Sequence, residues 1–379
     1  MTQEEYRREM DNVAWLVACA VNEQTPDPER VRDLDLPLLH AAASRHMLCA
    51  AVAMALESAG VYDAQFTRSK AAALRKLALM DMDMAAISQR LEAAGIWYMP
   101  LKGILLKEDY PAFGMREMSD HDVLFDASRA EDVRGIMESL GFRTEEFGKH
   151  YHDVYVKAPV SSFEMHRDLI RDRAETGSRL ADYYRDVRGR LLPDAGSEYR
   201  LRFTPEDFYL FMIAHEYKHY SDGGTGLRSL TDTYVYLRKR QLDMDYVRAE
   251  AEKMGVAEYE AANRSLSMHL FGGQTLTDAD RKMLDYICLS GTYGTLHNSV
   301  VNKIRRGGGS RFRYMLGRFA VPFSKKNPRY AGFAEKYPLF YRFKILLPLL
   351  PFWRIIRSMR EGRFRNELNA INTRSTDES

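Results

Sequence analysis

The sequence predicts an α+β protein in which a small unit of alternating strands and helices lies between helical regions. Residues 4–94 are rich in Ala, Leu and Met and show no strand-like alternation. From Gly95 to about residue 172, short apolar runs alternate with helical stretches, and residues 176–290 return to a helical pattern. With 379 residues, 45% of them hydrophobic, the chain can bury a substantial core.

The N-terminal part predicts long helices that end at glycines. One helical stretch covers residues 41–60 and ends at Gly60, and a second runs from Ser69 to Ala94 and ends at Gly95. Glycine is common directly after a helix because it adopts the left-handed conformation without steric cost. We therefore expect residues 1–69 to form an N-terminal helical region.

The next hundred residues predict the strands. Residues 96–103 (IWYMPLKG) indicate a buried strand that runs into a turn, and residues 121–126 (HDVLFD) indicate a second strand. Ser128 can cap a helix that runs to Leu140. Three further strands or hairpin arms are expected at residues 143–147, 152–158 and 161–168. These elements define a predicted core of residues 70–172.

The remainder divides into a helical domain, residues 173–300, and a C-terminal region, residues 301–379. Pro205 is suited to open a helix that stops at Gly223. Between residues 301 and 365 there are 17 basic and two acidic residues, although the whole chain carries only +2. This basic, aromatic-rich segment is compatible with RNA, with an anionic membrane surface, or with the acidic remainder of the chain; we favour the last.

Cysteine usage and hydropathy indicate a cytoplasmic protein. The cysteines, Cys19, Cys49 and Cys288, are odd in number and widely spaced, so neither a disulfide framework nor a zinc knuckle is expected. The first twelve residues are polar and lack a signal-peptide core. The apolar run from Ile345 to Phe352 is too short to cross a membrane, so no transmembrane segment is expected.

Three carboxylates form the candidate chemical site. Asp120 and Asp122 are two apart in a predicted strand, so their side chains project to one face while His121 projects to the other. Glu164 lies on a neighbouring predicted strand and shares a face with His166. Clustered carboxylates are the ligands that Mg²⁺ needs. By themselves these residues permit a simpler interpretation, because Asp caps backbone groups at strand ends and Glu often hydrogen-bonds to His.

The stretch LKGILLKEDYPAFGMREMSDHDVLF (residues 101–125) resembles the bacterial uncharacterised nucleotidyltransferase family of the DNA polymerase β superfamily. The likeness includes Leu-Lys-Gly at 101–103, Arg116, and the Asp-x-Asp at 120 and 122. The strand with Glu164 and His166 is similar to the family's acid-x-His element. AHEYKH, GLRSLTD and a terminal LFG continue a looser likeness to about residue 275.

This resemblance implies a polymerase β-like core and an enzyme that transfers a nucleoside monophosphate from an NTP such as ATP to an acceptor hydroxyl. Mg²⁺ or Mn²⁺ would be the cofactor, held by Asp120, Asp122 and Glu164. Lys102, Gly103, Arg116 and His166 would contribute to binding the nucleotide and metal. Better-known members carry a Gly-Ser pair where this chain has Lys102 and Gly103. Arg116 is equally suited to clamp a phosphate or to pair with Asp120.

Two other functions remain open from the sequence. A protein of this fold can bind a nucleotide or RNA, the latter through residues 301–365, without catalysing a reaction. The segment His215-Glu216-Tyr217-Lys218-His219 matches the HExxH motif of zinc hydrolases, in which two histidines four apart on a helix bind the metal. No third ligand follows at the usual spacing, so this hypothesis ranks third.

Overall fold

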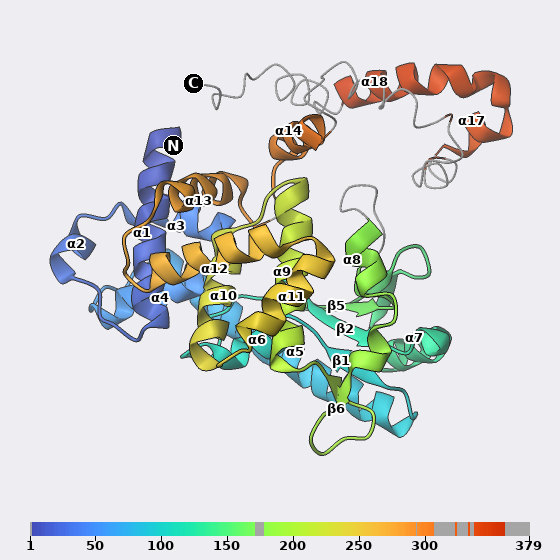
Figure 1. Ribbon diagram of the computed structural model, residues 1–379, viewed down its shortest axis with the longest axis horizontal. Coiled ribbons are helices and arrows are strands. Elements are labelled where there is room, and N and C mark those ends of the chain that lie inside the picture. The colour runs from blue at the N-terminus through green and yellow to red at the C-terminus, as the bar shows by residue number, and fades with distance from the viewer. Residues whose placement is uncertain are drawn as a thin grey trace.

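The computed structural model describes residues 2–170, 178–292, 294–306 and 337–360, together with positions 323 and 333. It shows one mixed sheet and many helices, which confirms the predicted α+β class (Figure 1). Strands and helices alternate around the sheet, and helices occupy both flanking parts of the described chain.

The sheet contains five strands in the order β1-β2-β5-β4-β3. β2 and β5 pair in parallel at its centre, and the other neighbours pair antiparallel. The strand bounds are β1 Tyr98–Pro100, β2 His121–Phe125, β3 Arg143–Glu146, β4 His152–Lys157 and β5 Ser161–His166. A second, two-stranded sheet pairs β6, Leu192–Pro193, with β7, Leu201–Arg202.

Two helices cover one face of the five-stranded sheet. α5 (Ala64–Ala93) and α7 (Ala130–Ser139) bury their apolar sides against alternate residues of β2 and β5. Because strand side chains alternate, burying Val123 on this face directs its neighbour Asp122 to the opposite face. His121 also lies on the α5 side, where its ring packs edge-on against Phe163.

The opposite side of the molecule is helical, and its core joins the N-terminal helices to helices of the second half of the chain. One apolar cluster combines residues of the N-terminal helices with those of α9 to α13, and α1 contacts α12 and α13 (Figure 1). The N-terminal helices are α1 Gln3–Val21, α2 Pro28–Arg32, α3 Leu36–Arg45 and α4 Cys49–Ser58. The later ones are α8 Ser178–Tyr183, α9 Pro205–Asp222, α10 Leu227–Lys239, α11 Met244–Met254, α12 Ala257–Phe271, α13 Asp278–Ser290 and α14 Leu296–Arg306.

The helix boundaries differ from the predictions in three places. The stretch at 41–60 divides into α3 and α4 because Met47 has φ of 54° and ends the first helix. α5 begins at Ala64, capped by Asp63, so the proposed boundary after residue 69 falls inside one helix. The turn before α7 is capped by Asp126, whose carboxylate accepts from the backbone N–H of Ser128.

Short elements complete the fold. They are α6 Gly103–Leu106, the 3₁₀ turns η1 Lys107–Asp109, η2 Ala127–Arg129 and η3 Val187–Arg190, and in the tail α17 Pro338–Arg342, η5 Lys344–Leu349 and α18 Leu350–Arg360. No helix in the described ranges has the length and apolar character to cross a membrane. Cys19, Cys49 and Cys288 are buried free thiols.

Candidate active site

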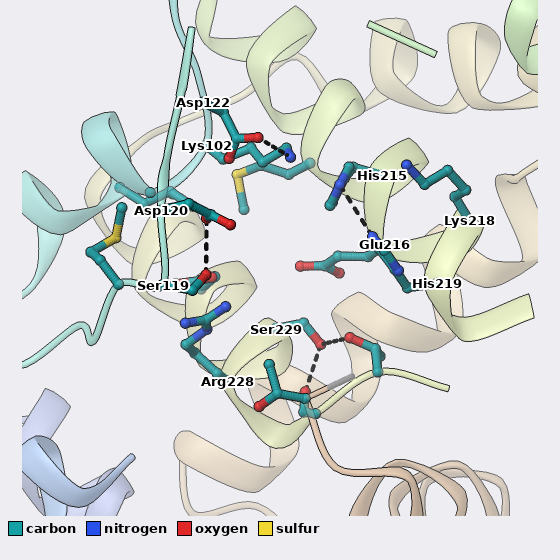
Figure 2. A pocket seen from close by; sticks show the side chains of 18 of the residues that line it. Lys102, Ser119, Asp120, Asp122, His215, Glu216, Lys218, His219, Arg228 and Ser229 are labelled. Atoms are coloured by element: carbon teal, nitrogen blue, oxygen red, sulfur yellow. Dashed lines mark hydrogen bonds and ion pairs between the residues drawn. The ribbon is translucent and has the colours of Figure 1, made fainter. Parts of the chain in front are cut away.

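The sheet brings the predicted carboxylates to one place. Asp122 of β2 and Glu164 of β5 are register partners in parallel strands, so their side chains lie side by side on the face turned away from α5. Asp120 precedes β2 on the same side of the alternation. All three line a cavity of about 350 Å³ between the sheet and α9 and α10 (Figure 2).

The carboxylates concentrate negative charge. Burial, reinforced by the charges of Asp122 and Glu164, raises the pKa of Asp120. Asp122 is also buried, yet the nearby charge of Lys102 and a hydrogen bond from His166 lower its pKa. A partly buried carboxylate with a raised pKa beside two others is a donor set that a divalent cation fits, because the cation relieves their mutual repulsion.

Lys102 lies directly at the carboxylates. Its Nζ donates to Asp122 Oδ1 at 2.8 Å, and its backbone has φ of 46° and ψ of −117°. Such a conformation is uncommon outside glycine and is often found at functional sites. Burial opposes the charged form of Lys102, but Asp122 outweighs it and raises the lysine pKa. The ammonium therefore provides fixed positive charge at the cavity floor.

His166 interacts with the carboxylates. Its Nε2–H donates to Asp122 Oδ1 at 2.7 Å, and the same nitrogen is 3.5 Å from Glu164 Oε2. Although burial favours the neutral ring, these two carboxylates raise the pKa of His166. The imidazole thus bridges the two central strands on the cavity side.

Arg116 and Gly103 occupy the base of the cavity. The Arg116 guanidinium donates through Nε and Nη2 to the two carboxylate oxygens of Asp232 on α10, at 2.7 Å each. The sequence suggested that Arg116 either pairs with Asp120 or is available to bind a phosphate. In the structure its guanidinium pairs with Asp232 instead. A Cβ on Gly103 would lie 2.2 Å from Arg116 Nη1, so any larger residue would force the Arg116 and Met118 side chains to shift. α6, which begins at Gly103, is a single turn.

α9 and α10 line the side of the cavity opposite the sheet. Apart from the HExxH motif, the sequence analysis proposed no site residues on these two helices. Figure 2 shows His215 and Glu216 of α9 across the cavity from Asp120, with Arg228 and Ser229 of α10 beneath. Arg228 donates through Nη1 to the backbone oxygen of Glu117 at 2.8 Å. Within the described ranges it forms no ion pair with a carboxylate, and burial together with the charge of Arg116 lowers its pKa. Arg228 lies in the GLRSLTD segment, whose likeness to the family was the sequence feature that could have identified this arginine as a site residue.

The HExxH residues do not assemble a zinc site. His215 and His219 face one another, with their Nε2 atoms 3.3 Å apart. Glu216 accepts a hydrogen bond from Asn263 Nδ2 at 3.1 Å, and burial raises the glutamate pKa well above its usual value. Among the described residues, three candidate ligand atoms converge at the sheet instead, around Glu164. The geometry therefore gives the zinc hydrolase hypothesis no support.

A mixed sheet whose two central strands carry carboxylates facing a cavity lined by both acidic and basic side chains is consistent with a nucleotidyltransferase-like core. The chain matches the model of the family described as "Uncharacterised nucleotidyltransferase" over residues 32–272. This span is more than half of the chain, and the protein therefore belongs to that family. The corresponding comparisons find no match among curated proteins or solved structures.

Proposed function

We propose that the protein transfers a nucleoside monophosphate from an NTP to a hydroxyl group and releases pyrophosphate, as enzymes with a polymerase β-like core do. The observation that supports this most directly is the register pairing of Asp122 with Glu164, with Asp120 at the same cavity. Asp120, Asp122 and Glu164 would hold Mg²⁺ or Mn²⁺, which when bound supplies positive charge to the reacting phosphate.

The protein's own residues have separate tasks in this reaction. The acceptor oxygen forms a bond to the α-phosphorus, and the bond from that phosphorus to the oxygen bridging to the β-phosphate breaks. Glu164 takes the proton from the acceptor hydroxyl, and pyrophosphate leaves with the bridging oxygen. The positive charge of Lys102 partly neutralises the negative charge of the carboxylates and of the reacting phosphate.

Arg228 is the better candidate for binding the triphosphate than Arg116. Both are at the cavity, but both oxygens of Asp232 already satisfy Arg116. Arg228 is partly buried and has no carboxylate partner in the described chain. A partly buried cation without a counter-ion is costly unless a ligand supplies the anion. The NTP phosphates are such an anion, and guanidinium groups bind them in a bidentate manner.

The test is incubation with each labelled NTP, Mg²⁺ or Mn²⁺ and cell extract, followed by identification of the labelled product. Asp122→Asn keeps the side-chain shape and removes a metal-binding charge, so labelling should fall by orders of magnitude while the protein stays folded. Asp245→Asn, whose side chain is 90% exposed, is the matched control. Undiminished labelling by the Asp122 variant would contradict the proposal. Nucleotide binding without any labelled product would favour the non-catalytic alternative.

A further inference from the structure

The imidazoles beside Glu164 form a feature that three carboxylates alone do not explain. His152 of β4 and His166 of β5 are register partners in antiparallel strands, so both rings lie on the cavity side with Glu164. His152 Nδ1 is 3.7 Å and His166 Nε2 is 3.5 Å from Glu164 Oε2. One ligand atom from each of the three residues lies within 4.8 Å of the others. To bind a metal ion, His166 Nε2 would release to solvent the proton that it donates to Asp122 in the metal-free protein.

These separations suit a single metal ion. Ligand atoms around an ion at about 2.1 Å lie roughly 3.0–3.5 Å from one another. The two nitrogen-to-oxygen separations, 3.7 and 3.5 Å, are within a few tenths of an ångström of this range, and the two histidine nitrogens lie within 4.8 Å of each other. The Nδ1 atom of His152 is buried and has no hydrogen-bond partner in the described structure. An unpartnered buried nitrogen is costly, and a metal ion would satisfy it without any new protein contact.

We propose that His152, Glu164 and His166 form a transition-metal position at the edge of the carboxylate site, which prefers Zn²⁺, Mn²⁺ or a similar first-row ion to Mg²⁺. Imidazole nitrogen suits these ions, whereas Mg²⁺ prefers oxygen ligands. The proposal deepens the proposed function, because Glu164 is shared by both metal positions. It also assigns His152, which the sequence motifs did not indicate.

Titration of the full-length protein with Co²⁺ tests this position, because the visible absorption of Co²⁺ reports nitrogen ligands and coordination number. The parent protein should bind one Co²⁺ with intense bands that persist in excess Mg²⁺. His152→Ala should weaken this binding by about 10-fold to 100-fold. His152→Cys should restore binding and add a thiolate charge-transfer band. His150→Ala is the control, since the His150 side chain is 60% exposed.

The outcomes separate this inference from the proposed function. Co²⁺ binding that His152→Ala leaves unchanged would overturn the metal position, whatever the nucleotide assays show. If Co²⁺ binding depends on His152 but the protein labels no product, the inferred metal position would stand and the proposed transferase activity would be refuted. Thermal unfolding of each apo variant shows whether a loss of binding reflects a loss of folding.

A separate surface feature lies in the C-terminal segment. Residues 337–360 contain five basic residues and no acidic residue. The same segment exposes seven large apolar side chains, of which Ile345 is 86% and Leu349 is 55% exposed. Among the side chains that the structure describes in this segment, the exposed set is Leu339, Phe343, Ile345, Leu346, Leu349, Phe352 and Trp353. Exposed apolar groups in such density mark an interaction surface.

The segment forms a small unit held together by contacts between its own elements. α17 and α18 both contact η5, the turn between them, and the Trp353 ring packs on Tyr337 and Phe340. Figure 1 shows the two helices at the margin of the molecule, away from the five-stranded sheet. The aromatic contacts thus hold the turn while aliphatic groups remain exposed.

We also infer that this segment binds the surface of an anionic lipid membrane. Aliphatic Ile and Leu side chains insert among acyl chains, and the accompanying Arg and Lys residues attract anionic headgroups. RNA fits the segment less well, because four of the seven exposed apolar side chains, including the most exposed one, Ile345, are aliphatic and offer no ring on which a base can stack. Binding would be interfacial, since none of the described helices can span a bilayer.

Flotation of the full-length protein with vesicles of phosphatidylcholine and phosphatidylglycerol tests this inference. The protein should float with these vesicles, bind much less to pure phosphatidylcholine, and lose binding as salt rises. Ile345→Glu with Leu349→Glu should reduce binding at least roughly tenfold. Tyr62→Glu is the control, because Tyr62 is 75% exposed elsewhere. Undiminished flotation of the double variant would overturn the inference, as would tight tRNA binding without vesicle binding.

Discussion

The buried ion pair between Arg116 and Asp232 ties the loop that precedes β2 to α10. Both side chains are 7% exposed, and Tyr110 Oη donates to Asp232 Oδ1 at 2.6 Å. Asp232→Ala would leave the Arg116 guanidinium buried without its counter-charge. Breaking one side of a buried pair costs about 3–5 kcal/mol. Because domains are stable by only about 5–15 kcal/mol, this is a large fraction of the total.

Urea unfolding followed by circular dichroism measures this loss, and a double-mutant cycle isolates its cause. Arg116→Met removes the guanidinium but keeps an unbranched chain, so the variant carrying both Arg116→Met and Asp232→Ala should recover part of the stability that Asp232→Ala loses. The exposed pair of Arg134 and Glu138 is the control, and Glu138→Ala should change the midpoint little. A loss below about 1 kcal/mol for Asp232→Ala would refute the reasoning.

Three further predictions concern the site and its supports. Gly103→Ala should lose about 1–3 kcal/mol in urea unfolding, because the new Cβ would lie 2.4 Å from Met118 Sδ; wild-type stability would show that the neighbours give way. Arg228→Met should weaken NTP binding about 10-fold to 100-fold in equilibrium dialysis, whereas Arg143→Met, at a 74% exposed side chain, should not. Burial lowers the pKa of His46 to about 4. Between about pH 6.5 and 4 the unfolded chain therefore binds a proton that the folded chain excludes, so stability falls as pH falls, by roughly 1 kcal/mol per unit. The stability of the His46→Asn variant should depend less steeply on pH in this range. An equally steep dependence would show that groups other than His46 cause it.

The secondary structure was largely predictable where the pattern is local. Alternation along His121–Phe125 predicted a strand with Asp122 on one face, and β2 has these bounds. Pro205 and Gly223 predicted the ends of α9, with Thr204 as its cap. The helix break at Met47 was not predictable, because His46 is held there by Cys288 and Leu227, far away in the sequence.

The sequence by itself determined the class of fold, the family, and which carboxylates share a strand face, because these depend on the two-residue period and on a contiguous motif. Only the tertiary structure decided which strand lies beside β2, and hence that Glu164 faces Asp122. It also placed His152 at Glu164 and paired Arg116 with Asp232, 116 positions away. Such partners are chosen by burial, since a charge removed from water requires a counter-charge at short range wherever the chain can supply one.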